Sequence, residues 1–227
     1  MNIVRVEGLT KCYRLGGAEV RALDDVSLTV TEGEFLAFAG PSGSGKSTLL
    51  NMIGCIDVPD TGRVWIDQED VGGRSPDELA ELRARSIGFV FQTFNLLPVL
   101  SAAENVEYPL LNVRSVSRVE RRLRVQRFLE VVGLERFAHH RPNEMSGGQR
   151  QRVAIARALA THPRLVLADE PTANLDQQTG ASMLELMKKI NEKSRTTFIF
   201  STHDPQVMQM ADRCVYLRDG RVAQHLS

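Results

Sequence analysis

Gly40-Pro-Ser-Gly-Ser-Gly-Lys46-Ser47 is the segment that decides the fold. It follows the apolar run 35–39 and precedes a helical pattern that starts near Lys46, which is the strand–loop–helix context of a phosphate-binding loop. Glycines allow successive N–H groups to point into one cavity, and the following helix directs the positive end of its dipole there. The segment therefore predicts that Lys46 reaches phosphate groups and that the Ser47 hydroxyl binds Mg²⁺. A flexible glycine turn is the weaker alternative.

Apolar runs of strand length alternate with longer helical patterns on both sides of this loop. We expect strands at 35–39, 87–91, 165–168, 197–201 and 214–217, and helices near 46–55, 177–192 and 205–210. Several of the runs are apolar on both faces, which is typical of parallel strands covered by helices. The alternation predicts an α/β fold with a mainly parallel sheet.

The first third and the middle of the chain depart from this alternation. Short strands punctuated by Gly, Asp and Thr at 4–9, 26–30 and 62–66 predict a small antiparallel β subdomain. Helical patterns at 104–111, at 118–132 and from about Ser146 predict an inserted helical subdomain. We therefore expect one domain over 1–227, with 1–92 and 163–227 as its α/β core and 93–162 as its helical subdomain.

A second motif is the apolar run that ends in two acids, Leu165-Val-Leu-Ala-Asp169-Glu170. At the end of a strand, Asp169 can hold Mg²⁺ through water beside Ser47. Glu170 is placed to orient or deprotonate an attacking water. Two acids after a strand could also simply cap the next helix, but the phosphate-loop pattern in the same chain favours the chemical interpretation.

The third motif is Met145-Ser146-Gly147-Gly148-Gln149, at the start of another helical pattern. Ser146 is a good N-cap residue, and the two glycines leave N–H groups available for an anion. This second anion site lies in the helical part of the chain. Two chains arranged head to tail would bring it to the phosphate loop of the other chain.

Taken together, these motifs resemble those of ABC transporter ATPases from one end of the chain to the other. The segment 40–47 is similar to the Walker A loop, 165–170 to Walker B, and 146–149 to the family signature, in which Met145 replaces the usual Leu. The resemblance implies a P-loop NTPase (RecA-like) core. It also implies an ATP-binding and ATP-hydrolysing subunit with ATP and Mg²⁺ as cofactors.

The resemblance also implies roles for single residues. Tyr13 matches the aromatic residue that stacks on adenine, Gln92 the glutamine that senses the γ-phosphate and Mg²⁺, and His203 the switch histidine. Alone, they would be a packing residue, a surface amide and a neighbour of a helix cap. Ala173-Asn174-Leu175-Asp176 matches the loop that crosses the dimer interface.

The resemblance thus gives a complete set of expected site residues. Catalysis falls to Lys46, Gln92, Glu170 and His203, and Mg²⁺ binding to Ser47, Gln92 and Asp169. The nucleotide-binding residues are Tyr13, Gly40, Pro41, Ser42, Gly43, Ser44, Gly45, Lys46, Ser47, Thr48, Gln92, Ser146, Gly147, Gly148, Gln149, Asp169, Glu170 and His203.

Three further segments narrow the resemblance within the family. The lipoprotein-release, macrolide-export and antimicrobial-peptide-resistance group is resembled by Phe91-Gln92-Thr93-Phe94-Asn95-Leu96-Leu97-Pro98, by the Glu104-Asn105-Val106 that follows, and by Asp169-Glu170-Pro171-Thr172-Ala173-Asn174-Leu175-Asp176. An importer of amino acids and a non-transport ABC ATPase are the alternatives. Repair members carry a long coiled coil and translation members a second cassette, and this sequence has neither. The guanine-reading Asn-Lys-x-Asp pattern of GTPases is also missing from the sequence.

The amino-acid composition limits the kinds of partner that this protein is expected to bind. Lys plus Arg equals Asp plus Glu at 28 each, so no overall charge attracts nucleic acid. The five arginines between 118 and 127 are spread around a helix and are expected to be a solvated face.

No apolar run approaches the length needed to span a bilayer, and three scattered cysteines favour a reducing compartment. We expect a cytoplasmic protein, peripheral on the cytoplasmic face of the inner (plasma) membrane. Its expected partners are a second copy and a membrane permease that contacts the apolar run at Phe94, Leu96, Leu97 and Pro98.

Overall fold

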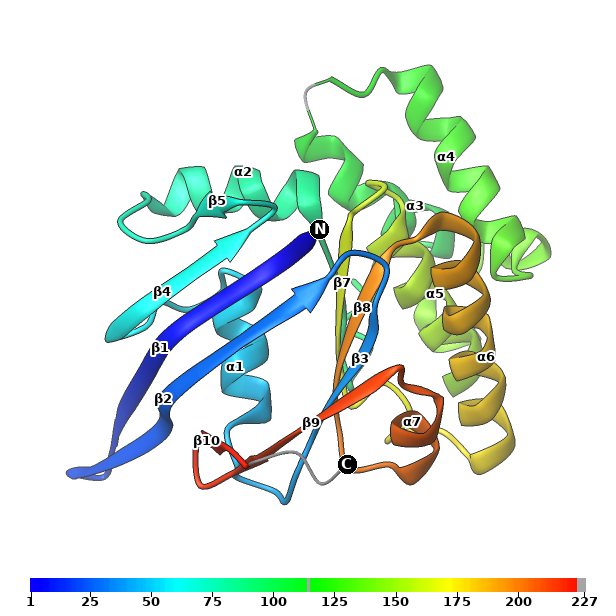
Figure 1. Cartoon of the computed structure of the whole chain (residues 1–227). Coiled ribbons are helices and arrows are strands. Elements are labelled where there is room, and N and C mark those ends of the chain that lie inside the picture. The colour runs from blue at the N-terminus through cyan, green and yellow to red at the C-terminus, as the bar shows by residue number, and fades with distance from the viewer. Residues whose placement is uncertain (114, 224–227) are drawn as a thin grey trace.

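A six-stranded sheet forms the centre of the computed structural model, which describes residues 1–113 and 115–223 (Figure 1). Its strand order is β10-β9-β3-β8-β7-β6, and all neighbours pair in parallel except the edge strand β10. The bounds are β3 (Phe35–Ala39), β6 (Ile87–Val90), β7 (Leu165–Asp169), β8 (Thr197–Thr202), β9 (Arg213–Arg218) and β10 (Arg221–Val222). The prediction of an α/β fold with a mainly parallel sheet is confirmed.

A second, antiparallel sheet lies beside the first and has the order β2-β1-β4-β5. Its strands are β1 (Asn2–Leu15), β2 (Ala18–Thr31), β4 (Thr61–Ile66) and β5 (Glu69–Asp70). The small antiparallel sheet was predicted, but β1 and β2 extend further, into a hairpin that turns at Gly16 and Gly17, both at positive φ. The residues of β2 next to the turn, 18–21, are all exposed, so no alternation of buried and exposed side chains marks this part of the hairpin.

Helices cover both faces of the central sheet. They are α1 (Lys46–Ile53), α2 (Pro76–Ser86), α3 (Ala102–Glu107), α4 (Arg118–Val131), α5 (Gly147–Leu159), α6 (Gln177–Ser194) and α7 (Pro205–Met210), with short 3₁₀ helices η1 (Tyr108–Asn112), η2 (Glu135–Phe137) and η3 (Pro142–Glu144). In place of the single helix predicted at 104–111, α3 passes into η1 where Pro109 cannot donate a backbone hydrogen bond. In the part of the chain that the structure describes, no helix has the length and apolar character to cross a membrane.

Alternation of side chains along the strands builds two cores. Leu36 and Phe38 of β3 face the antiparallel sheet, α1 and α2. Phe35 faces the opposite way, toward α5, α6 and α7, and its ring centroid lies 4.5 Å from that of Phe200 in β8. Because both faces are buried, the parallel strands are held rigidly between two layers, and the loops at their ends start from fixed positions.

One buried amide organises the connection between β6 and α3. Asn105 is fully buried, and its side-chain oxygen accepts from the N–H of Leu97 at 2.8 Å. Its side-chain nitrogen donates to the carbonyls of Leu97, Leu100 and Ser101 at 2.9–3.1 Å. A single side chain thus replaces the regular hydrogen bonding that this loop lacks.

Replacing this amide should loosen the loop and destabilise the protein. We expect Asn105→Ala to lower the free energy of unfolding by about 1–3 kcal/mol, because buried backbone groups lose their partner. Asn143→Ala, at an exposed asparagine of η3, is the matched control and should change it by less than about 0.5 kcal/mol. Urea unfolding monitored by circular dichroism measures both, and equal values for the two variants would contradict the role of Asn105.

Candidate functional site

The candidate site lies at the carboxyl edge of the parallel sheet. The loop after β3 leads into α1, Gln92 follows β6, Glu170 follows β7 and His203 follows β8. These strands are neighbours in the sheet in the order β3-β8-β7-β6, so their exits lie along one edge. Such an edge is the usual position of ligand sites in α/β sheets.

The backbone of the loop at 40–47 depends on two glycines. Gly40 has a φ of 144°, and a Cβ added there would lie 2.1 Å from the carbonyl oxygen of Leu217. Gly45 has a φ of 100°, and a Cβ there would lie 2.4 Å from the carbonyl oxygen of Ala22. Gly45 is also the N-cap of α1, and no side chain caps this helix. The first N–H groups of α1 therefore remain free to bind an anion.

Lys46 lies along the inside of this loop. Its Nζ donates to the carbonyls of Gly40 at 2.8 Å and Pro41 at 2.9 Å, and the residue is only 7% exposed. Beside it, the hydroxyl oxygen of Ser44 is buried and has no hydrogen-bond partner among the described residues. A buried ammonium and a buried hydroxyl with spare bonding capacity are what a phosphate group would satisfy.

A cavity of about 590 Å³ opens above the loop. The loop residues from Ser42 to Thr48 line it together with Gln92, Glu170 and His203. Gly40, Pro41 and Asp169 do not line the cavity. The carbonyls of Gly40 and Pro41 accept hydrogen bonds from Lys46, and the carboxylate of Asp169 accepts one from Ser47. The structure thus brings the predicted residues of the two strand-end motifs into one place.

Two hydrogen bonds connect the loop and strand ends at this cavity. The Ser47 hydroxyl donates to Oδ1 of Asp169 at 3.0 Å. Nδ1 of His203 lies 2.7 Å from Oε1 of Glu170, whose side chain is 15% exposed, whereas that of His203 is 70% exposed. Glu170 has a positive φ of 44°, an uncommon conformation for a residue with a side chain. These contacts place oxygen ligands and a carboxylate–imidazole pair at the opening of the loop.

Three residues of β2 complete the lining and were not predicted. Val20, Arg21 and Ala22 lie along the same cavity. Asp24, as the nearest carboxylate, raises the pKa of the exposed Arg21 guanidinium. Nothing in the local sequence marks these residues, since their position depends on how the antiparallel sheet folds against the loop.

Tyr13 lies apart from the cavity lining. Its hydroxyl donates to Oδ2 of Asp57 at 2.8 Å, and Nζ of Lys11 lies 5.3 Å from its ring centroid. Burial and the Asp57 carboxylate raise the pKa of the Tyr13 hydroxyl above its usual value. The ring is half-buried, so part of it remains available for stacking.

The residues of the third motif lie in a different cavity, of about 580 Å³. Ser146, Gly147, Gly148 and Gln149 line it, and it shares no lining residue with the cavity at the phosphate loop. Ser146 Oγ accepts from the N–H of Gln149 at 3.3 Å, and Gln149 Oε1 accepts from the N–H of Ser146 at 2.9 Å. This reciprocal capping box fixes the start of α5. Within one chain, the third motif does not reach the phosphate loop.

Asn174 connects these two parts of the molecule. It lines the cavity at the start of α5, and its side-chain nitrogen donates to the carbonyl of Gln92 at 2.8 Å. Two residues later, Asp176 caps α6 by accepting from the N–H of Thr179 at 3.0 Å. Hydrogen bonds from the side chain and the backbone N–H of Thr179 lower the pKa of the Asp176 carboxyl. The loop 173–176 therefore has a defined conformation and contacts both sites.

Comparison with known proteins agrees with this geometry. An uncharacterised ABC transporter ATP-binding protein of Methanocaldococcus jannaschii, MJ0796, is 49% identical over 223 residues, 97% of this chain and 95% of that protein. The lipoprotein-releasing system ATP-binding protein LolD of Bordetella avium is 48% identical over 96% of this chain and 95% of its own length. The macrolide export ATP-binding/permease protein MacB of Syntrophobacter fumaroxidans is 47% identical over 97% of this chain, which spans 31% of that protein.

Solved structures give the same result for the fold. A dimeric structure of the MJ0796 cassette in a post-hydrolysis state, bound to ADP and phosphate, has a TM-score of 0.89 at 49% identity, covering 97% of both chains. A second dimeric structure of that protein has a TM-score of 0.90 at 48% identity, with the same coverage. The model of the ABC transporter family matches residues 23–173. The predicted resemblance is thus confirmed, and this chain belongs to the ABC transporter family.

Proposed function

We propose that this chain binds and hydrolyses ATP as one of two identical subunits, and that the dimer drives a separate membrane permease at the cytoplasmic face of the membrane. One observation carries the proposal: the phosphate-loop residues and the Glu170–His203 pair share one cavity, whereas the Ser146 motif lines another. The dimeric MJ0796 structure with bound ADP and phosphate supports the same activity, and a second dimeric structure of that protein supports the assembly of two subunits.

The phosphates of ATP fit the loop at 40–47. The uncapped start of α1 offers N–H groups, and Lys46 offers an ammonium whose two present partners are neutral carbonyls. An ammonium exchanges such partners for a phosphate with a gain in charge-assisted hydrogen bonding. The hydroxyl of Ser44, which no described residue bonds, supplies a further donor. We assign the adenine to the exposed part of the Tyr13 ring.

Mg²⁺ fits the pair formed by Ser47 and Asp169. Their hydroxyl and carboxylate oxygens lie 3.0 Å apart beside the loop, and Mg²⁺ prefers such oxygen ligands. Gln92, which lines the same cavity, provides an amide oxygen. When bound, the ion neutralises charge on the phosphate oxygens.

Hydrolysis needs a group that takes a proton from water, and we assign this role to Glu170. Its carboxylate lines the cavity and is largely shielded from solvent. One carboxylate oxygen, Oε1, is already bonded to His203, which leaves Oε2 for the attacking water. His203 is exposed enough to reach a ligand while its Nδ1 orients the carboxylate.

The proposal requires two chains, because within one chain the phosphate loop and the Ser146 motif line separate cavities. In a head-to-tail dimer, the start of α5 in one subunit covers the phosphate loop of the other, with ATP between them. Gly147 and Gly148 present N–H groups there, and Gly148 also allows α5 to approach α6, since a Cβ would lie 2.6 Å from the Thr179 methyl. Loop 173–176, which contacts both cavities, lies at the same interface.

The permease binds, in our proposal, at a groove of about 330 Å³ between the α/β part and the helical part at 93–162. Phe89, Phe91, Asn95, Tyr108 and Arg157 are among its lining residues. Arg157 also donates to the carbonyl of Phe94, so α5 holds the segment that follows Gln92. LolD and MacB are named for lipoprotein release and macrolide export, and we propose a cargo of one of these kinds.

The apolar run expected to contact the permease is partly exposed. Leu96 is half-buried and packs against the core of the helical part. Leu97 is 37% exposed and its N–H is held by Asn105. The groove adds an exposed aromatic surface in Tyr108, which is 50% exposed.

The role of Glu170 can be tested by an isosteric change. We expect Glu170→Gln to retain ATP binding while turnover falls roughly 10²-fold or more, because the proton acceptor is lost. ATP should then hold the variant as a closed dimer that elutes early in size-exclusion chromatography. Glu185→Gln removes an exposed carboxylate of α6 and should behave like the unmodified protein. Near-normal hydrolysis by Glu170→Gln would leave Glu170 a structural role only.

The arrangement in trans can be tested at the second helix start. Ser146→Arg should bind ATP normally, but it should neither dimerise with ATP nor hydrolyse it, because the added side chain blocks the approach of the other subunit. Ser117 is also an exposed N-cap, of α4, and accepts from the N–H of Glu120 at 3.2 Å. Ser117→Arg therefore loses a comparable cap and should still hydrolyse ATP. If Ser146→Arg hydrolyses ATP at the normal rate, the signature motif does not face a nucleotide.

The permease contact can be tested at the groove. We expect Tyr108→Asp to reduce co-purification with the proposed permease partner on the order of 10-fold, since a charge replaces an aromatic contact. ATPase activity and melting temperature of the isolated subunit should be retained. Leu123→Asp, at an exposed leucine of α4, is the control. Unchanged co-purification of Tyr108→Asp would exclude this groove as the docking site.

A further inference from the structure

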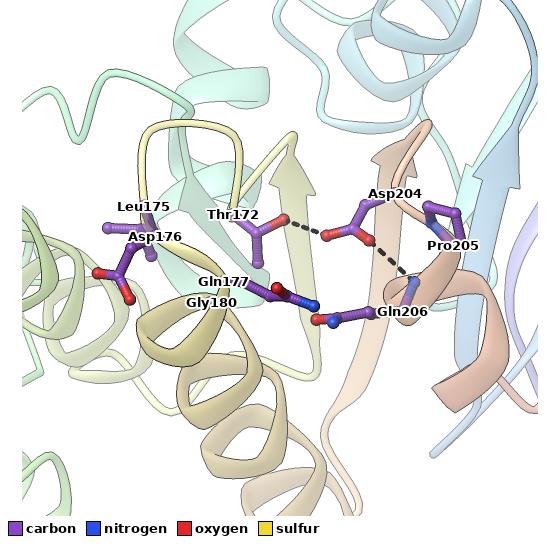
Figure 2. A pocket seen from close by; sticks show the side chains of 8 residues that line it. All are labelled: Thr172, Leu175, Asp176, Gln177, Gly180, Asp204, Pro205 and Gln206. Atoms are coloured by element: carbon purple, nitrogen blue, oxygen red, sulfur yellow. Dashed lines mark hydrogen bonds between the residues drawn. The ribbon is translucent and has the colours of Figure 1, made fainter.

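The loop that leaves β7 is joined at three places to the end of β8 and the loop that follows it. The N–H of Glu170 donates to the carbonyl of Ser201 at 2.9 Å, and the Glu170 carboxylate bonds His203. A third bond runs from the hydroxyl of Thr172 to Oδ2 of Asp204 at 3.0 Å. The third bond lies outside the proposed nucleotide cavity, in a neighbouring one of about 490 Å³ between the starts of α6 and α7 (Figure 2).

Asp204 is fixed from three directions. Besides Oδ2, its Oδ1 accepts from the N–H of Gln206 at 2.9 Å, and Figure 2 shows both bonds leaving the one carboxylate. Its own N–H donates to the hydroxyl of Thr202 at 2.9 Å. Thr202 is fully buried and Thr172 is 7% exposed. Asp204 is partly buried and lines the cavity, so a water that replaced the Thr172 hydroxyl would bind the carboxylate without fixing its position relative to β7.

His203 depends on these neighbours for its position. Its side chain is 70% exposed, and within the described residues its ring is hydrogen-bonded to Glu170 alone. Packing therefore does not orient the imidazole. Its backbone is held by Thr202 on one side and by Asp204 on the other. The position of the ring relative to the Glu170 carboxylate thus follows from how firmly Asp204 is anchored.

We propose that Thr172 is a positioning residue for hydrolysis, whose hydroxyl anchors Asp204 and thereby keeps His203 on the Glu170 carboxylate. This inference rests on the proposed roles of Glu170 and His203. Thr172 also starts the turn that carries loop 173–176, since its carbonyl accepts from the N–H of Leu175 at 3.0 Å. The same residue therefore connects the loop expected at the dimer interface with the pair that acts on water.

A purely structural role for the bond predicts a different outcome. Asp204 also caps α7 through Oδ1, and that bond does not involve Thr172. Removing only the Thr172 hydroxyl leaves the cap in place. A variant of Thr172 therefore separates the anchoring of His203 from the capping of α7, which a variant of Asp204 would not do.

The test compares Thr172→Val, which keeps the shape and removes the hydroxyl, with Thr172→Ser, which keeps the hydroxyl. Thr197→Val is the matched control, because Thr197 is a fully buried threonine at the opposite end of β8 whose hydroxyl accepts from the N–H of Gly33 at 2.9 Å. Each full-length variant is assayed for kcat and KM with Mg-ATP and for melting temperature. The imidazole ¹⁵N chemical shifts of His203 report its bond to Glu170 in the nucleotide-free protein.

We expect Thr172→Val to lower kcat on the order of 10-fold at a KM within about twofold, because misplacement of a reacting group affects turnover more than binding. Its His203 shifts should move toward those of Glu170→Gln. Thr172→Ser should restore both readouts, and Thr197→Val should lose only stability. Unchanged His203 shifts in Thr172→Val, or a loss of kcat that Thr172→Ser does not restore, would overturn the inference. Normal hydrolysis by Glu170→Gln would instead refute the proposed function on which it rests.

Discussion

The parallel hydrogen-bonded register of β3, β8, β7 and β6 is the constraint on which the site depends. Residue Ala39 pairs with Thr202 and Asp169 with Ser201, so these strands end together. The loops that follow must start side by side, and chemistry that needs a cation, a carboxylate and an imidazole can draw each from a different strand. The two buried cores hold the strands in this register, because a shift by one residue would exchange the faces that Phe35 and Leu36 occupy and remove each from its core.

The helical part is positioned by side-chain contacts, not by strand pairing. It contacts the sheet mainly through α5, whose Arg157 reaches the loop that starts at Gln92. The consecutive positive φ values of Phe94 and Asn95 show that this loop adopts a conformation that side chains disfavour. Contacts from α5 hold it there. A displacement of α5 therefore changes the segment beside Gln92, and the reverse follows by the same contacts.

Much of the fold could be predicted from the sequence because the strands that carry the site are continuous apolar runs. The contact between Ser47 and Asp169 followed from two strand-end motifs meeting at one edge. In contrast, α2 has a clear start signal in Ser75 and Glu78, which form a capping box, but only a narrow apolar stripe, and it was not predicted. The lining by β2 and the Thr172–Asp204 bond depend on tertiary packing. No local pattern of residues specifies which loops pack against one another.

The capping box at Ser146 and Gln149 has a consequence for how two subunits meet. The backbone N–H groups of Ser146 and Gln149 each donate to the other residue's side chain. The first turn of α5 is therefore ordered before any ligand or partner binds. The conformational entropy of this surface is lost during folding and not during association. In the proposed dimer, association on this face would therefore join two preformed surfaces. The proposed association would then lose little of its free energy to the ordering of this turn.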